Sequence, residues 1–261
     1  MDISGMALRA QVAWFRHLAA RGFAQISTGD GFAVSTGLDS NTENGAVIGA
    51  SMPDSAELDT LLGWLRAKAV PASVLVTGTP EAELTARLIA QGLHPERTGN
   101  NMGRLLPGFD TEAADPAVRE WQILEVNDVP DLRRNQRVYA EDGWWDEPGE
   151  LDRRVETAAR LGFGRGQPIR HWTACHQGVP VGAATSFQFD DGVWLVHCCV
   201  AKPWRRHGIG TALTRVRLAA ATRRGAVRAV TFPSPDGYHL HHSIGFELAP
   251  IHPGRCFYLQ N

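Results

Sequence analysis

The chain has 261 residues, of which 43% are hydrophobic and 21% charged, as in a globular protein with one large domain or two small ones. The formal net charge of −2 offers no broad electrostatic attraction to nucleic acid or to an anionic membrane. No apolar stretch approaches the ~20 residues that span a bilayer, and the N-terminus lacks the pattern of a signal peptide. We therefore expect a cytoplasmic protein that binds neither nucleic acid nor membrane.

The first half predicts a mixture of helices and strands from its apolar periodicity. A helix is expected at about 7–21, and two short strands near 32–35 and 46–49. A second helix carries apolar residues on one face: Leu58, Leu61, Leu62 and Leu65. A buried strand at 73–77 and a third helix ending at Gln91 follow.

The segment 107–118 contains Pro, Gly and acidic residues but no periodicity, so we place a linker there. It separates a domain at 1–106 from a domain at 119–261. In the second domain the apolar pattern predicts a strand at 121–126, two helices and then three strands. The three strands are joined by Gln177-Gly178 and Asp191-Gly192, which are typical hairpin turns. After them we expect a long helix, a buried strand at 226–232, a short helix to Ser243, and two last strands, "GFELAP" and "RCFYLQ".

The two halves repeat one order of elements. "SVLVT…LTARLIAQGLHPER…MGRLL" in the first half is similar to "RAVTF…YHLHHSIGFELAP…RCFYL" in the second. Gly92-Leu93 precedes Met102 much as Gly245-Phe246 precedes Arg255. This similarity indicates a duplicated domain.

The stretch "CCVAKPWRRHGIGTALTRVRLAAA" joins an apolar strand to an amphipathic helix through a glycine turn. A helix N-terminus presents unpaired N–H groups and the positive end of the helix dipole, and glycines let an anion approach the main chain. The pattern Arg205-x-x-Gly208-x-Gly210 therefore predicts a turn that binds a pyrophosphate. It lacks the third glycine of a dinucleotide-binding fingerprint and the lysine of a P-loop.

At this point the sequence resembles the GNAT superfamily of N-acetyltransferases. "VAKPWRRHGIGTAL" is similar to the family's sequence of strand end, proline, aromatic residue and R/Q-x-x-G-x-G/A, and "SPDGYHLHHSIGF" resembles its later segment. The resemblance covers about 121–261, and the first half shares only the topology and "QGLHPE". It implies an α/β fold of mixed, mostly antiparallel sheet flanked by helices, here in two tandem copies, of which the first is degenerate and lacks the pyrophosphate loop.

The resemblance also implies how acetyl-CoA, as co-substrate, would bind. The sheet would open between the strands 193–200 and 226–232, and pantetheine would meet backbone groups there. The implied coenzyme-binding residues are Cys199, Val200, Arg205, Arg206, His207, Gly208, Ile209, Gly210, Thr211 and Ser234. The acceptor amine would then attack the thioester directly, so catalysis would depend on proximity and on backbone donors for the oxyanion.

The catalytic residues depart from the family pattern. Many members carry a tyrosine, as acid for the leaving thiolate, at the position occupied here by His241, and Tyr238 is a less favoured substitute. A neutral His241 can donate one N–H to the sulfur, or it lines the pocket. His197 is the titratable residue on the strand before the glycine turn, on the face of Val193 and Leu195 by strict alternation, and is either the base or a core histidine. Proton removal through water by Glu141 or Asp142 is an equal alternative.

The loop "AEDGWWDEPGELD" lies where family members admit the acceptor. Asp142, Trp144 and Trp145 are candidate substrate-binding residues, since two indole rings among six acids suit a cationic amine. The alternative is a solvated loop whose tryptophans pack on the first half.

No histidine or cysteine spacing indicates a metal site, and Cys198 and Cys199 lack the signs of an activated thiolate. We expect a monomer or homodimer that acetylates a small-molecule primary amine, such as an amino acid, another metabolite or an antibiotic. Two alternatives stay open: a catalytically silent acyl-CoA-binding sensor, and an enzyme that acetylates a protein N-terminus or lysine.

Overall fold

The computed structural model describes residues 2–51, 54–96, 101–109, 121–145, 147–249 and 255–259. The chain forms two compact units. The N-terminal unit comprises Ser4–Gly99 and Pro250–Asn261, and the C-terminal unit comprises Met1–Ile3 and Asn100–Ala249. Most of the expected linker at 107–118 lies outside the described residues. Within the described ranges, no helix is both long and apolar enough to cross a membrane.

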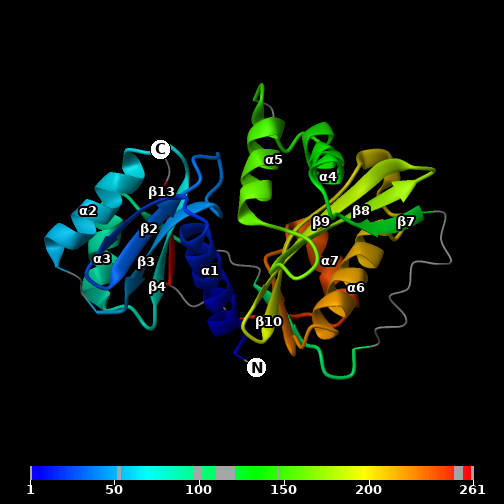
Figure 1. The fold of residues 1–261 in the computed structure, drawn as a ribbon. Helices are drawn as coiled ribbons and strands as arrows, with labels where there is room; N and C mark the ends of the chain where they lie inside the picture. The colour runs from blue at the N-terminus through cyan, green and yellow to red at the C-terminus, as the bar shows by residue number, and fades with distance from the viewer. Residues whose placement is uncertain are drawn as a thin grey trace. The chain divides into compact units, whose positions relative to one another are not determined.

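The sheet of the N-terminal unit has the strand order β1-β2-β3-β4-β13-β5 (Figure 1). Its strands are β1 (Ala24–Thr28), β2 (Gly31–Ser35), β3 (Asn44–Gly49), β4 (Ala72–Thr77), β5 (His94–Pro95) and β13 (Cys256–Leu259). Its helices are α1 (Ile3–Ala20), α2 (Ser55–Arg66) and α3 (Ala82–Ala90). The leucines of α2 that were predicted to share one face are all buried in a core with β3 and β4.

The sheet of the C-terminal unit has the order β12-β6-β11-β10-β9-β8-β7. Its strands are β6 (Met102–Leu105), β7 (Trp121–Glu125), β8 (Ile169–His176), β9 (Val179–Phe189), β10 (Gly192–Val200), β11 (Arg228–Thr231) and β12 (Glu247–Leu248). Its helices are α4 (Val129–Glu141), α5 (Glu150–Leu161), the 3₁₀ turn η1 (Lys202–Trp204), α6 (Ile209–Thr222) and α7 (Pro235–Ser243). β10 and β11 pair in parallel, and the other strand pairs of this sheet, as far as the structure describes them, are antiparallel.

Helices cover both faces of the C-terminal sheet. Ala183 of β9 packs with Val138 and Tyr139 of α4, whereas the next residue, Ala184, packs with Leu213 of α6. Because neighbouring side chains of a strand point to opposite faces, α4 and α6 lie on opposite sides of this sheet. Figure 1 shows the same layers.

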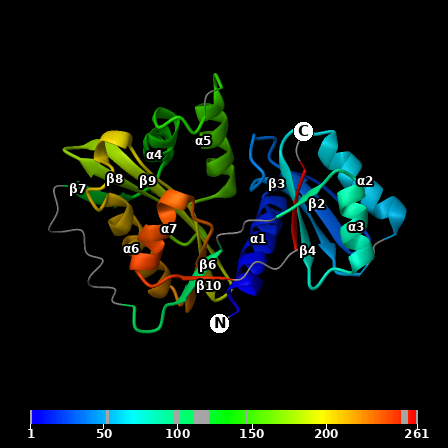
Figure 2. The ribbon, with the colours of Figure 1, turned by 180° about the vertical axis from the view of Figure 1, so that it is seen from behind.

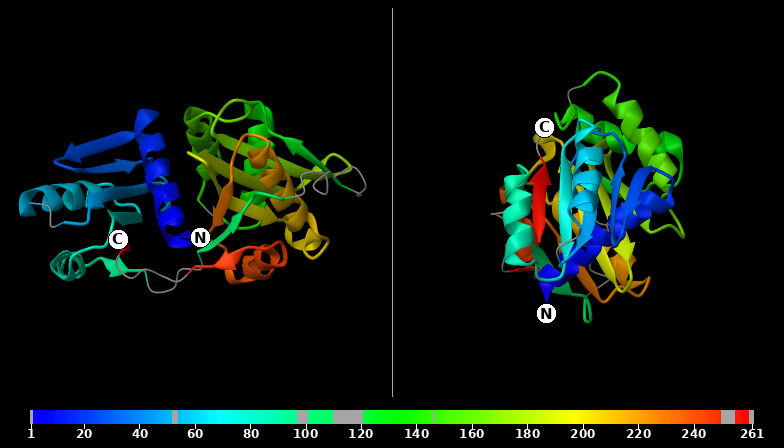
Figure 3. Two further views of the ribbon diagram at one scale, coloured as in Figure 1. Left: turned by 90° about the horizontal axis from the view of Figure 1, so that it is seen from below. Right: turned by 90° about the vertical axis from the view of Figure 1, so that its left-hand side faces the viewer.

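One strand is exchanged in each direction between the units. β6 follows the elements of the N-terminal unit in sequence but pairs with β11 and β12 of the C-terminal unit. β13 ends the chain but pairs with β4 and β5 of the N-terminal unit, where it is the red strand in Figures 2 and 3. The expectation that "RCFYLQ" ends the sheet of the second half is therefore wrong. β13 lies between β4 and β5 in one sheet, and β6 lies between β11 and β12 at the equivalent position of the other. The apolar pattern of either strand therefore suits both sheets.

The predicted fold class is confirmed: two mixed, mostly antiparallel sheets are flanked by helices, and the repeated order of elements occurs in both units. β1 was not expected, because Gln25, Ser27 and Thr28 dilute its apolar alternation. Helix α1 begins at Ile3, four residues before the expected start at 7.

Candidate functional site

The C-terminal sheet opens where β10 extends past the end of β11. The two strands pair in parallel from Gly192↔Arg228 to Leu195↔Thr231. At the last pair, Thr231 Oγ1 donates a hydrogen bond of 3.1 Å to Leu195 O. β10 continues to Val200 and, among the described strands, pairs there with β9 alone. The opening lies between the two strands for which the sequence predicted it.

A β-bulge in β10 changes which side chains face the opening. Leu195 pairs with Ser186, but the next register pair is His197↔Thr185, so Val196 is an extra residue. Leu195 packs with Leu218 of α6, and Cys198 also packs with residues of α6, whereas Cys199 packs on α4. The expectation that His197 shares the face of Leu195 is therefore wrong, because a bulge reverses the alternation that it interrupts.

The turn after β10 ends in a helix N-terminus without a side-chain cap. Arg206 and Gly208 have positive φ values of 68° and 81°, and Gly208 is the N-cap of α6. No side chain accepts a hydrogen bond from the first N–H groups of α6, and no acidic residue lies in its first turn. Gly210 has a different role, since a Cβ there would lie 2.9 Å from Leu240 Cδ1 of α7. The first N–H groups of α6 thus form a cradle suited to an anion.

Arg205 is held at the rim of this turn by the carboxylate of Asp142. Its guanidinium lies 2.5 Å from Asp142 Oδ2, and its Nε donates to Val200 O at 3.0 Å. The Arg205 side chain is 46% exposed and that of Asp142 only 5%. Cys199 Sγ lies 3.4 Å from the same carboxylate oxygen. Arg206 and His207 are exposed beside them.

His241 is buried in α7, with its ring centroid 5.2 Å from that of Phe246. Burial, and then the charge of Arg217, lower the pKa of His241 to about 3, so the imidazole is neutral at pH 7. Its Nδ1 has no hydrogen-bond partner among the described residues. Ser234 is the N-cap of α7 and accepts from Gly237 N at 3.2 Å.

His197 lies among aromatic rings on the α4 face of the sheet. Its ring centroid is 6.1 Å from that of Tyr139 and 6.0 Å from that of Trp144. Burial, and then the charges of Arg154 and Arg217, lower the pKa of His197 to about 4. At neutral pH it is an uncharged imidazole that can accept a proton.

Comparison with known proteins places this geometry in a family. Residues 129–246 match the model of the acetyltransferase (GNAT) family. They form a GNAT acetyltransferase domain. No curated protein sequence matches the chain.

Solved structures extend the likeness over both units. The chain is similar to a GCN5-related N-acetyltransferase from Kribbella flavida, with 17% identity, a TM-score of 0.61, and 99% of this chain and 94% of that one covered. It is also similar to a tandem GNAT protein from the clavulanic acid biosynthesis pathway, with 15% identity, a TM-score of 0.55, and coverage of 99% and 96%. At these identities the likeness shows the fold, which the first half of the chain shares with the GNAT domain.

The acids of the loop between α4 and α5 and of the first turn of α5 are largely engaged by arginines. Asp152 pairs with Arg133 at 2.5 Å, and Glu147 and Glu150 pair with Arg153 at 2.8 and 2.5 Å. The guanidinium of Arg154 lies 5.0 Å from the centroid of the Trp145 ring. Trp144 is 47% exposed, and Glu141, at the end of α4, is also exposed. Asp146 lies outside the described residues.

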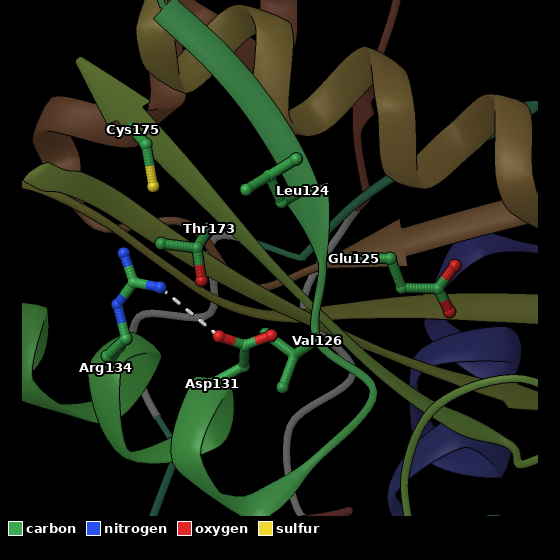
Figure 4. A pocket seen from close by; sticks show the side chains of 7 residues that line it. All are labelled: Leu124, Glu125, Val126, Asp131, Arg134, Thr173 and Cys175. Carbon is green, nitrogen blue, oxygen red and sulfur yellow. Dashed lines mark hydrogen bonds and ion pairs between the residues drawn. The ribbon is translucent and has the colours of Figure 1, made fainter. Parts of the chain in front are cut away.

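A small pocket of the GNAT domain lies away from the opening (Figure 4). It is lined by residues of β7, α4 and β8, namely Leu124, Glu125, Val126, Asp131, Arg134, Thr173 and Cys175. None of the predicted site residues lines it. In the described ranges, no group of three or more histidines, cysteines and acids is placed to hold a metal ion.

Two residues near the opening were missed by the sequence analysis. Arg217 of α6 is 1% exposed, and Tyr139 of α4 is 2% exposed. Arginine is normally an exposed residue, so the residue type did not indicate burial. The spacing did, because Arg217 follows Leu213 by four residues and therefore lies on the buried side of the helix.

Proposed function

We propose that the GNAT domain transfers the acetyl group of acetyl-CoA to a small-molecule primary amine. The observation that carries this proposal is the opening between β10 and β11, which ends at the uncapped N-terminus of α6. A carbon chain fits an opening edged by backbone groups, and a pyrophosphate fits a helix N-terminus flanked by cationic side chains.

The coenzyme would follow β10 toward α6. Backbone groups of Cys199 and Val200 would meet the pantetheine, and the N–H groups from Arg206 to Thr211 would meet the pyrophosphate. Arg205 suits a phosphate contact because Asp142 and Val200 O hold its guanidinium in place while much of the side chain stays exposed. Ser234 would contribute from the start of α7, across the opening.

His197 and His241 are the proposed groups for proton transfer. His197 is neutral at pH 7, so its unprotonated ring nitrogen can accept a hydrogen bond from the amine and relay the amine's proton to solvent, directly or through a water held by Glu141. A neutral His241 would donate one N–H to the thiolate that leaves, in place of the tyrosine of other members. The amine attacks the carbonyl carbon of the thioester, the C–S bond breaks, and coenzyme A leaves as the thiolate, which takes up the proton lost by the amine through solvent.

The acceptor would enter beside the loop 142–145. Since Asp142, Glu147, Glu150 and Asp152 are paired with arginines, the exposed ring of Trp144 and the exposed carboxylate of Glu141 are the parts that suit an amine. Asp142 would touch the acceptor only by leaving Arg205.

Thr211→Glu tests the coenzyme site without endangering the fold. Thr211 lies in the first turn of α6, where an acid stabilises a helix, yet the same carboxylate would repel a pyrophosphate. We expect calorimetry to show micromolar binding of acetyl-CoA by the wild type and at least about 100-fold weaker binding by Thr211→Glu. Thr60→Glu adds the same charge to an exposed position of α2 and should bind as the wild type does.

The result separates the remaining functions. An absence of acetyl-CoA binding in the wild type would overturn the proposal. If the wild type binds acetyl-CoA, an amine and peptide panel with thiol detection follows. Turnover of free amines supports the proposal, turnover of peptides alone replaces the acceptor class, and binding without turnover favours a sensor.

A further inference from the structure

The bulge of β10 meets a buried arginine of α6. Arg217 is the ninth residue of this helix and is 1% exposed. One of its terminal nitrogens donates to Thr185 O and to His197 O, each at 3.0 Å. Thr185 and His197 are the register pair directly after the bulge. The guanidinium therefore binds carbonyl groups on both strands at the point where the register shifts.

The remaining donors of Arg217 meet neutral groups of its own helix. Its Nε lies 3.3 Å from Leu213 O, and its second terminal nitrogen lies 3.1 Å from Thr214 Oγ1. Among the described residues, no carboxylate forms an ion pair with it. A buried cation without an anion is costly, and an apolar side chain of similar size would avoid that cost. Only the need for several N–H donors at one buried point accounts for an arginine here.

The bulge decides where the His197 ring lies. In an unbroken strand, His197 would share the α6 face with Leu195, in the apolar cluster that contains Leu218. With the bulge, it lies on the α4 face near Tyr139 and Trp144. We propose that Arg217 is a positioning residue, which fixes the bulge of β10 and thereby holds the His197 ring toward α4 and Trp144. This inference rests on the proposed function in so far as His197 serves acetyl transfer.

The charge of Arg217 also acts on His197. It is the third cause, after burial and Arg154, of the lowered pKa of His197. The titratable and charged groups around this ring come from α4, α5, α6, β8 and β10 itself: Tyr139, Asp142, Arg154, Arg217, His171, Cys198 and Cys199. Loss of Arg217 removes a nearby cation, so the imidazolium becomes easier to form.

Histidine NMR tests the proposal without an acetyl acceptor. The protein would be labelled with ¹³C-histidine, the His197 signal assigned with His197→Gln, and its titration followed from about pH 3.5 to about pH 8.5, a range that includes the lowered pKa of the wild type. In Arg217→Met and Arg217→Gln we expect the pKa of His197 to rise by about one unit or more and the contacts of its ring with Trp144 to weaken. Arg217→Lys keeps the charge and one donor group, and we expect a smaller shift.

The three variants keep the proposal open to refutation. If Arg217→Met does not fold, Arg217→Gln, which retains amide donors, and Arg217→Lys decide. An unchanged titration and unchanged ring contacts in the neutral variants would mean that Arg217 only fills space. Ring contacts in Arg217→Lys as strong as in the wild type would also overturn the proposal, because a lysine keeps the charge but not the several donors of the guanidinium. Calorimetry of the wild type with acetyl-CoA is independent of these results, so a failure of the proposed function is recognised separately.

Discussion

The two sheets differ at their parallel strand pairs. In the N-terminal unit β3 and β4 pair up to their last residues, whereas in the C-terminal unit β10 extends past the end of β11. β3 and β4 pair in parallel from Gly45↔Ser73 to Gly49↔Thr77, the last residue of each strand. At the last pair, Thr77 Oγ1 donates to Ile48 O at 3.1 Å, and beyond it Glu81 N donates to Ala50 O at 3.3 Å. These bonds tie the end of β3 to the β4 side. In the described part of this unit, β3 therefore does not extend past the end of β4 as β10 extends past β11.

Within the described residues, the end of β10 is bonded to the turn that follows it and not to β11. Val200 O accepts from Arg205, which pairs with Asp142 at the end of α4. The helices that follow β3 and β10, α2 and α6, also differ at their N-termini. The carboxylate of Asp54 caps α2 and accepts from Ala56 N at 2.8 Å, whereas α6 has no side-chain cap. A carboxylate in the cradle repels a pyrophosphate, so the fold alone does not make a coenzyme site.

Acid should destabilise the C-terminal unit selectively. Burial is the leading cause that lowers the pKa of His171, His197 and His241, to about 3, 4 and 3. The unfolded chain, with a histidine pKa of ~6.5, binds more protons, so stability is complete above pH ~6.5 and falls as the pH drops toward the folded values. In the N-terminal unit, burial raises the pKa of Glu96, which has the opposite effect. We expect a loss of several kcal/mol in the C-terminal unit between pH 7.5 and 5.

Hydrogen exchange read by mass spectrometry, corrected for intrinsic rates, resolves the two units. Protection of β8–β10 should decrease at pH 5 while that of β3 and β4 changes little. His241→Leu removes one of the three groups and should reduce the loss. Equal losses in both units would contradict the assignment of acid sensitivity to these histidines.

Gly45→Ala should destabilise the N-terminal unit by about 3 kcal/mol, since overpacking of a tight core costs amounts of this order. A Cβ at Gly45 would lie 2.6 Å from the Phe15 ring and against Ser73 O of the neighbouring strand. Urea unfolding followed by circular dichroism measures the loss. Gly49→Ala is the matched control, since its Cβ would meet nothing closer than Ser51 Oγ at 4.0 Å. Similar midpoints for the two variants would show that β3 and β4 are less tightly joined.

The sequence predicted most of the elements because each has a local signal, whereas the opening between β10 and β11 was implied by the resemblance to the GNAT superfamily. The glycine turn, the leucines of α2 and the hairpin dipeptides all determine structure within a few residues. The bulge at Val196 has no such signal, since it arises when Arg217, distant in sequence, supplies donors to β10. The exchange of β6 and β13 escaped for a related reason, as either strand suits either sheet.

The pairing of Asp142 also lay beyond the sequence. Acids beside tryptophans favoured a site for a cationic amine, but the arginines that engage them come from other elements, such as Arg205 after β10 and Arg133 on α4. The interpretation of these acids as an amine site was therefore changed by charge partners distant in sequence. The interpretation of the glycine turn was not, because it depends on neighbouring residues.

The ion pair of Asp142 and Arg205 gives the smallest expected effect. It bears directly on the difference between the units, because Arg205 also bonds Val200 O at the end of β10. If Asp142 acts through Arg205, then Asp142→Asn and Arg205→Met should each weaken acetyl-CoA binding about tenfold, or about 1.4 kcal/mol. The double variant should then be no weaker than Arg205→Met alone, since residues in contact are not additive. Calorimetry measures all four proteins, and Arg133→Met, which breaks the exposed pair with Asp152 between α4 and α5, is the control. Additive losses would show that Asp142 contacts the coenzyme itself. Unchanged acetyl-CoA binding by Asp142→Asn, with a raised KM for the amine in a turnover assay, would place Asp142 at the acceptor site.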